Sequence, residues 1–226
     1  FSIDYGTIYN AFRKRDSEKT GAVFLVSQKV ENAAERETMT LLSVSSPNAI
    51  TEAVKILTSG GVVVYPTDTL YGLGADALNS EAVEKVSKIK RRPGPWSIAV
   101  TDLDMLKEYC KIPIHHEEFI NSQLPGAVTL ILPGASHQIE NFVAPGNTVG
   151  VRIPDHSVPV ELAKALKKPI TSTSVNRTGE PPLNDPKTID KQFSTEIDLI
   201  IDAGTLPSSS GSTIYDLTTE SVKAVR

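Results

Sequence analysis

The feature that most constrains the fold is the alternation of short apolar runs with amphipathic segments. Val62 to Tyr65 and Ile197 to Ile201 are rich in β-branched residues, and turn-forming residues lie beside them, so they predict buried strands. Ser80 to Ile89 carries apolar residues at helical spacing and predicts a helix between strands. Because helices and strands interleave along the chain, the sequence predicts an α/β fold: a twisted, open mixed sheet with helices packed against it.

The remaining elements follow the same signals. Ser46 followed by Pro47 is typical of a helix N-cap with proline in the first turn, and Gly60-Gly61 ends that helix. Further strands are predicted at 97–100, 128–132, 148–153, 170–172 and 212–217. Further helices are predicted at 103–109 and 158–166.

Length, charge and cysteine content exclude several classes. A chain of 226 residues suffices for one large α/β domain, and no apolar run approaches the roughly 20 residues of a membrane span. Cys110 is the only cysteine, which excludes an intramolecular disulfide and makes a cysteine-built metal site implausible. A net charge of −4 argues against whole-surface nucleic-acid binding but leaves room for a local basic patch. We expect a cytoplasmic protein that does not enter a membrane.

Residues 1–38 differ from the rest of the chain. They contain the basic run Arg13 to Arg15 and one apolar patch, Ala22 to Val26, followed by a polar stretch. The first residue is Phe1, as expected for a processed or partial product. We expect 1–38 to be a partly disordered appendage and 39–226 to be the catalytic domain.

The loop Tyr65 to Gly74 follows a buried strand directly. Its hydroxyls and its carboxylate, Asp68, come at the carboxyl end of that strand, where ligands gather in open α/β sheets. Gly72 and Gly74 would let the backbone approach a ligand closely. An ordinary turn in which Asp68 caps neighbouring amides explains the loop equally well.

The basic segment Lys90 to Arg92 closes a predicted helix. It fits a solvated helix end, where cations face the negative end of the dipole, and it fits a phosphate clamp. Pro93 disfavours helical geometry at Arg92, so we expect an extended segment in which Lys90 and Arg92 face one side and Arg91 the other.

Two more segments could carry chemistry. Arg152 lies in an apolar strand, so it needs a carboxylate partner from the protein or from a ligand. Thr171 to Gly179 is dense in hydroxyls and amides, which suits a polar pocket floor or a simple turn. The four histidines show no metal-ligand spacing, and we expect His115 and His116 at the surface near a helix start.

Taken in order, these segments resemble the YrdC-like threonylcarbamoyl-AMP synthase family in its short form, which lacks an extra C-terminal domain. The resemblance covers about residues 49–226. The matching segments are Pro66–Gly74, Lys90–Pro93, Leu124–Gly126 with Thr129, Val151–Pro154, Ser174–Asn176 and Ser212–Ile214.

The resemblance implies a large electropositive cavity that binds L-threonine and ATP, with Mg²⁺ on the phosphates and no metal held by the protein. Bicarbonate would be the third substrate. The product would be passed to tRNA threonylcarbamoyltransferase proteins that modify adenosine 37, with at most weak contact to tRNA or RNA. The implied threonine residues are Thr69, Arg152, Ser174 and Thr213. The implied nucleotide residues are Lys90, Arg92, Thr148, Asn176 and Arg226, with Lys90 and Arg92 also catalytic.

The chain departs from the family pattern at two positions. Trp96-Ser97 stands where Asn-Pro is usual, and Thr101 stands where a histidine that touches threonine is often found. Two alternative functions remain at this point: a module that binds double-stranded RNA or tRNA, and a carbamoyl-adenylate-forming domain of the hydrogenase-maturation type. The absence of any Cys-x-x-Cys motif argues against the second.

Overall fold

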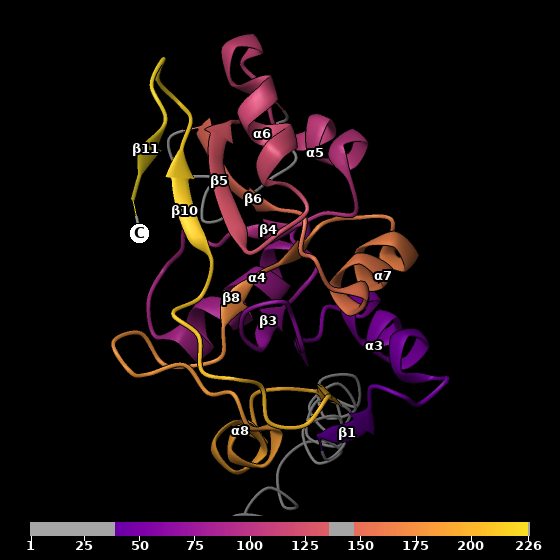
Figure 1. The fold of residues 1–226 in the computed structure, drawn as a ribbon. Coiled ribbons are helices and arrows are strands. Elements are labelled where there is room, and N and C mark those ends of the chain that lie inside the picture. Colours follow the sequence, from indigo (N-terminus) through magenta and orange to yellow (C-terminus); the bar gives the residue numbers. More distant parts are fainter. Residues whose placement is uncertain (1–38, 136–146, 226) are drawn as a thin grey trace, which may run out of the picture. The chain divides into compact units, whose positions relative to one another are not determined.

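The computed structural model describes residues 39–135 and 147–225. The expected appendage, residues 1–38, lies outside this part of the chain and stays a prediction. The described strands form two mixed sheets rather than the single sheet expected from the sequence (Figure 1). The α/β class with a mixed strand pattern is confirmed.

The first sheet contains the strand that precedes the candidate ligand loop. Its strand order is β1 (Thr40–Ser43), β9 (Leu199–Asp202), β2 (Val63–Tyr65), β3 (Gly72–Gly74) and β8 (Thr173–Ser174). Strand β9 runs parallel to both β1 and β2, whereas β3 runs antiparallel to β2 and β8. The loop between β2 and β3 therefore lies at the carboxyl end of a central strand.

The second sheet contains the strand that carries Arg152. Its strand order is β11 (Lys223–Ala224), β10 (Thr213–Asp216), β5 (Val128–Pro133), β6 (Thr148–Arg152), β4 (Ile98–Ala99) and β7 (Ile170–Thr171). Strands β5 and β10 are parallel, as are β4 and β6, while β5 and β6 are antiparallel. Only Ser172 separates β7 of this sheet from β8 of the other.

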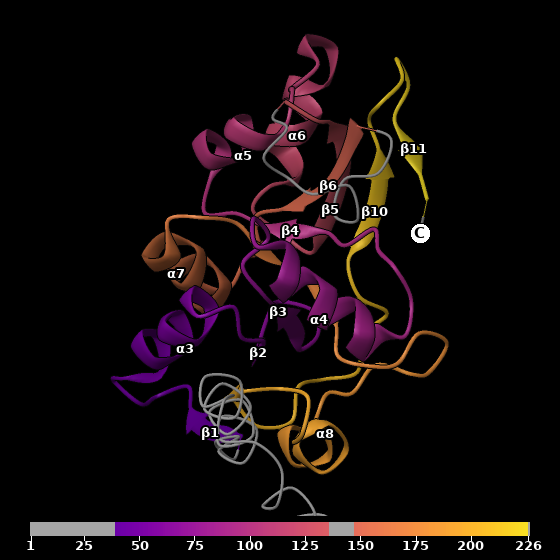
Figure 2. The same cartoon turned by 180° about the vertical axis from the view of Figure 1, so that it is seen from behind.

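Helices cover these sheets, and the predicted ones are confirmed with small shifts. They are α3 (Ala49–Thr58), α4 (Ser80–Lys90), α5 (Leu103–Tyr109), the 3₁₀ turn η2 (Ile114–His116), α6 (Glu117–Gln123), α7 (Ser157–Leu166) and α8 (Pro186–Phe193). Helices α3 and α7 pack side by side in both views (Figures 1 and 2). None of the described helices is long and apolar enough to cross a membrane.

The first helix begins later than the sequence predicted. Asn48 is the residue before α3, and Ser46-Pro47 forms a turn whose Ser46 carbonyl accepts the Ala49 N–H at 3.1 Å. The proline thus shapes the entry to the helix instead of its first turn. Helix α6 begins directly after the helix start expected near His115 and His116. Helix α8 and strands β1, β3, β8 and β11 were not anticipated, since most of them are too short to show a clear period.

Strand β2 is buried on both faces and connects two apolar clusters. Val64 packs in the larger cluster with Leu73 and Ile98, whereas Val63 packs in the smaller one with Leu57 and Leu199. Successive side chains of a strand point to opposite faces, so β2 contributes to both cores. The loop that follows β2 therefore starts from one of the most firmly held strands of the fold.

Thr171 links the two sheets. Its hydroxyl donates to the Leu73 carbonyl at 3.1 Å and accepts the Ala75 N–H at 2.9 Å, and its own N–H donates to the Ala75 carbonyl. The Tyr65 hydroxyl donates to the Thr171 carbonyl at 2.9 Å. Burial raises the pKa of Tyr65 to about 12, so this donor keeps its proton at any physiological pH.

The glycines of β3 accommodate Tyr65, a role that the sequence did not predict. A Cβ atom at Gly74 would lie 2.5 Å from Cε1 of Tyr65, and one at Gly72 would lie 2.8 Å from its Cζ. The Tyr65 ring thus lies across both glycines, and any side chain there would collide with it. Gly72 also lines the cavity described below, but Gly74 does not.

The expectation that His115 and His116 lie at the surface is wrong for His116. Its side chain is buried, with 2% of its surface exposed, and Nε2 donates to the Thr219 carbonyl at 2.7 Å. The contact ties the β10–β11 connection to η2. A histidine beside a helix start gives no sign of such a distant partner in the sequence.

We predict that Gly74→Ala lowers the free energy of unfolding by about 1–3 kcal/mol, because overpacking a rigid ring forces the strands apart. Urea denaturation measures the change. The penalty should persist in a Tyr65→Phe background, which keeps the ring, and should shrink in a Tyr65→Leu background. Equal penalties in both backgrounds would show that Tyr65 is not the cause.

Candidate functional site

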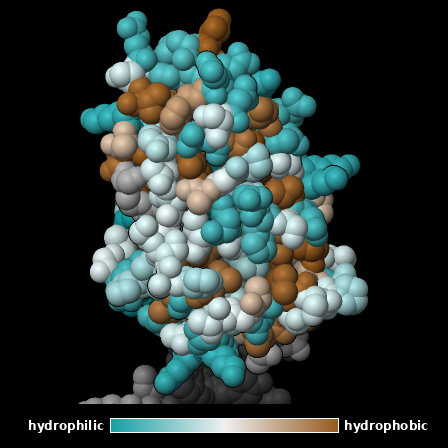
Figure 3. All heavy atoms as spheres, viewed as in Figure 1, coloured by the Kyte–Doolittle hydropathy of each residue, from teal (hydrophilic) through white to brown (hydrophobic). Residues whose placement is uncertain are grey.

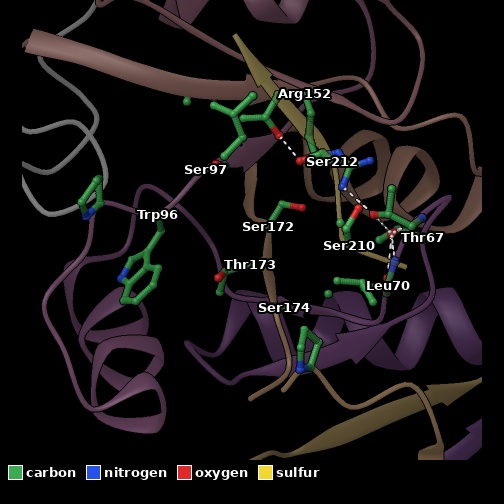
Figure 4. Close-up of a pocket in the computed structure, with 18 of the residues that line it drawn as sticks. Thr67, Leu70, Trp96, Ser97, Arg152, Ser172, Thr173, Ser174, Ser210 and Ser212 are labelled. Atoms are coloured by element: carbon green, nitrogen blue, oxygen red, sulfur yellow. Dashed lines mark hydrogen bonds between the residues drawn. The ribbon is translucent and has the colours of Figure 1, made fainter. Parts of the chain in front are cut away.

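A cavity of about 360 Å³ lies between the two sheets, which is within the usual size of small-molecule sites. It is lined by the loop after β2, the segment after α4, strands β5, β6 and β8, and the segment that leads into β10. Figure 4 shows Ser172, Thr173 and Ser174 across its middle, with Trp96 on one side and Thr67 and Leu70 on the other. Residues from several separate parts of the chain therefore meet in one place.

The loop after β2 is folded by its own side chains. The Thr67 hydroxyl donates to the Leu70 carbonyl at 2.6 Å and accepts the N–H groups of Thr69 and Leu70 at 3.1 and 3.2 Å. Thr67 thus does the capping that one of the two interpretations of the loop gave to Asp68. As a result Asp68 is free to reach across to the other sheet.

Asp68 and Arg152 form an ion pair between the loop and β6. Their side chains are 9% and 6% exposed, so both charges are largely removed from water. The other Asp68 oxygen accepts the Asp155 N–H at 3.2 Å. The protein's own carboxylate is therefore the partner that Arg152 required, one of the two possibilities left open by the sequence.

This ion pair does not use all the donors of Arg152. One terminal nitrogen, NH1, contacts the Thr69 hydroxyl at 3.3 Å, and Nε has no hydrogen-bond partner within the described residues. An orphaned buried N–H is rare and costs free energy. Arg152 and Thr69 both line the cavity, so a ligand carboxylate there would meet a donor, a hydroxyl and a positive charge.

Lys90 is the last residue of α4 and points at the segment after β8. It is 3% exposed, and its Nζ donates to the Ser174 carbonyl at 2.7 Å and to Oδ1 of Asn176. The Ser174 hydroxyl donates to the same Oδ1 at 2.7 Å. Burial, together with the charge of Arg92, lowers the pKa of Lys90 to about 8. In the described part of the chain no carboxylate neutralises this cation.

The basic segment is not extended, which corrects the sequence prediction, but it separates the side chains as expected. Arg91 caps α4 in the left-handed conformation, with φ of 55°, and its side chain is exposed. Arg92 lines the cavity, and its NH1 donates to the carbonyls of Gly94 and Pro93 at 2.8 and 3.1 Å. The left-handed cap therefore separates Arg91 from Arg92, as the alternation along an extended segment was predicted to do.

The other expected site residues are placed unevenly. Thr148 and Ser174 line the cavity, and Asn176 lies behind it in the Lys90 network. Thr213 is exposed and does not line the cavity, whereas its neighbours Ser212 and Ile214 do, because successive side chains of an extended segment point to opposite sides. Arg226 lies outside the described residues.

Sequence reasoning missed three residues of the site. Ser212 shares a 2.7 Å hydrogen bond with Thr129, and both hydroxyls are buried in the cavity wall. Asp68 was weighed as a cap or as a group at the ligand-binding end of the strand, but its ion pair with Arg152 was not predicted. Trp96 lines the cavity, whereas Thr101 lies apart from it and donates to Asp102 at the start of α5.

The charged residues that line the cavity are Arg92 and Arg152, while Lys90 lies one layer behind. No cluster of three metal-ligating side chains occurs among the described residues. Figure 3 shows pale residues of intermediate hydropathy in the centre of the face of Figure 1, between hydrophilic and hydrophobic patches. Hydroxyls, backbone groups and guanidinium groups suit a ligand that is polar and anionic.

Comparisons with known proteins point to one family. The Sua5/YciO/YrdC family model, described as "Telomere recombination", matches residues 55–226. The threonylcarbamoyl-AMP synthase of Pyrococcus abyssi is 34% identical over 170 residues, which are 74% of this chain and 50% of that protein. The synthase of Pseudoalteromonas translucida is 32% identical over 177 residues, which are 76% of this chain and 95% of that protein.

Solved structures agree with these matches. The crystal structure of P. abyssi Sua5 complexed with L-threonine has a TM-score of 0.76 at 30% identity, covering 83% of this chain and 56% of that one. HypF in its phosphate- and nucleotide-bound form has a TM-score of 0.70 at 21% identity, covering 79% of this chain and 28% of that one, which shows the fold alone. Because the family match takes in the cavity and the strands around it, this chain belongs to the Sua5/YciO/YrdC family.

Proposed function

We propose that this chain makes threonylcarbamoyl-adenylate and pyrophosphate from L-threonine, bicarbonate and ATP, for the modification of adenosine 37 in tRNA. The observation that carries the proposal is the cavity itself. Thr69 and Arg152 form one corner of it, where a carboxylate would bind, and Arg92 forms a separate cationic side, with Lys90 behind it. Relatives that are named threonylcarbamoyl-AMP synthases support the same function.

L-threonine would bind at the Arg152 corner. The Arg152 guanidinium and the Thr69 hydroxyl would donate to its carboxylate, and Asp68 would hold the guanidinium in place. A partly paired arginine suits this task because its net charge is reduced while a donor stays free. Ser174 and Ser212 offer further hydroxyls to the substrate from the opposite walls.

ATP would bind with its triphosphate toward Lys90 and Arg92. Threonine's amine and bicarbonate condense to a carbamate with loss of water. A carbamate oxygen then attacks the α-phosphorus, the bond to the β-phosphate oxygen breaks, and pyrophosphate leaves. The protein must neutralise the phosphates and bring two anions together, which is positioning and electrostatic work. This reaction needs no nucleophilic side chain.

Mg²⁺ would enter with the nucleotide. The described cavity wall supplies hydroxyls and cations but no carboxylate, so phosphate oxygens and water would be its ligands. Thr148 on β6 and Asn176 would contribute polar contacts to the nucleotide side, and Arg226 is proposed there from the family resemblance alone. The expected electropositive character of the cavity rests on Arg92 and Lys90, since Arg152 is paired.

The decisive experiment is detection by mass of threonylcarbamoyl-adenylate from purified protein, ATP, bicarbonate and threonine, without RNA. Product formation that requires all three substrates supports the proposal. Formation of a carbamoyl-adenylate from carbamoyl phosphate would instead favour the hydrogenase-maturation type of chemistry. RNA binding without any adenylate product would favour the RNA-binding module.

We predict that Lys90→Ala and Arg92→Ala each lower pyrophosphate release by about a hundredfold or more. Arg92→Ala removes a cation of the cavity wall, and Lys90→Ala removes the cation behind it that holds Ser174 and Asn176. Arg91→Ala is the matched control, since its exposed side chain points elsewhere, and it should change the rate by less than about threefold. Melting temperatures verify folding of all three variants. An Arg91→Ala enzyme as impaired as Arg92→Ala would contradict the clamp.

We predict that the double variant Asp68→Asn/Arg152→Gln folds well but raises the threonine KM about 10- to 150-fold, with little change in the ATP KM. Arg152→Gln alone should also destabilise the protein by about 3–5 kcal/mol, because it leaves the Asp68 charge buried and unpaired. Steady-state kinetics and urea denaturation separate the two effects. Equal changes in both KM values would show that Arg152 does not hold threonine.

A further inference from the structure

Trp96 is the only tryptophan in the chain, and it lies beside the cation that faces the cavity. Its side chain is 1% exposed, and its Nε1 donates to the Ser87 hydroxyl of α4 at 3.0 Å. The guanidinium carbon of Arg92 lies 4.2 Å from the centroid of the indole ring. Figure 4 places Trp96 at the edge of the pocket, across from Thr67 and Leu70.

This arrangement leaves the indole little opportunity to contact a ligand directly. Arg92 covers one ring face, Ser87 takes the only polar atom, and almost no surface of the residue remains exposed. A nucleotide base could stack on Trp96 only after Arg92 had moved away. The effect of Trp96 on a ligand must therefore pass through Arg92.

Arg92 is otherwise weakly held. Its hydrogen bonds come from NH1 and go to the carbonyls of Pro93 and Gly94, the next two residues of the same segment. No ion pair with a carboxylate fixes it within the described residues, in contrast to Arg152 and Arg177. If an arginine side chain becomes ordered only when a ligand binds, the lost rotamer entropy weakens the binding of that ligand. A stacking partner that is itself fixed removes part of that loss.

We propose that Trp96 is a positioning residue that holds the Arg92 guanidinium toward the triphosphate site through a cation–π contact, with Ser87 fixing the indole. The inference rests on the proposed function in one respect, which is that the anion facing Arg92 is the triphosphate of ATP. Stacking on tryptophan leaves the in-plane N–H groups of the guanidinium available, so Arg92 can be held and still donate to phosphate.

The test is a double-mutant cycle on ATP affinity, measured by calorimetric titration without threonine. Trp96→Leu should weaken ATP binding about 5- to 30-fold, the range expected for a cation–π contact that is largely desolvated. In an Arg92→Ala background the same substitution should change affinity by less than about twofold. Trp96→Phe keeps an aromatic face and should recover affinity to within about threefold of wild type.

Phe193→Leu is the matched control. Arg177 lies 4.5 Å from the Phe193 ring, but Glu196 pairs with Arg177 and neither residue lines the cavity. This substitution removes the same kind of contact from the core, so it should lower the melting temperature and leave ATP affinity within about twofold. If Phe193→Leu weakened ATP binding as much as Trp96→Leu does, Trp96 would act only as a core residue and the inference would be wrong.

Additive effects of Trp96→Leu and Arg92→Ala would also overturn it. If Trp96→Leu does not fold, Ser87→Ala measured with and without Arg92→Ala decides by the same criterion. If the effects of Trp96→Leu and Arg92→Ala on ATP affinity are coupled but the protein makes no threonylcarbamoyl-adenylate, the proposed function is wrong and the inference stands. Adenylate synthesis without coupling would refute the inference alone, and failure of the wild type to bind ATP would refute both.

Discussion

The site depends on the way Thr171 and Tyr65 hold two sheets together. Thr171 belongs to the second sheet, yet its hydroxyl and backbone bond to Leu73 and Ala75, and its carbonyl accepts the Tyr65 hydroxyl from the first sheet. These groups are fully buried, so each lost bond would leave a polar atom without a partner. The cavity lies between the two sheets that this link joins.

Two further cross-connections position the functional groups. Asp68 carries a charge from the loop after β2 to Arg152 on β6, and Lys90 at the end of α4 bonds to Ser174 on β8. Both cations are buried, and burial together with the charge of Arg92 lowers the pKa of Lys90. A bound anion would stabilise the charged form of Lys90. The desolvation that disfavours this charge in the empty protein would therefore strengthen its attraction for carboxylate and phosphate.

The two arginines of the cavity wall are held in different ways. Arg152 is fixed by a buried ion pair with Asp68, which offsets its charge, and its Nε has no partner among the described residues. Arg92 is fixed by an aromatic ring and nearby carbonyls, which leaves its charge uncompensated. That difference would suit the two proposed ligand groups, a small amino-acid carboxylate at Arg152 and a highly charged triphosphate at Arg92.

The sequence by itself determined the α/β class, most of the strands and longer helices, and the chemical kinds of group at the site. Apolar runs and helical spacing are local properties, and family resemblance located the cations and hydroxyls. Tertiary structure alone decided that the strands form two sheets, that Arg152 pairs with Asp68, that Gly72 and Gly74 accommodate Tyr65, and that Ser212 rather than Thr213 lines the cavity. Each of these depends either on contacts between residues that are distant in sequence or on which face of a strand turns inward. Periodic patterns along the chain predict neither of these properties.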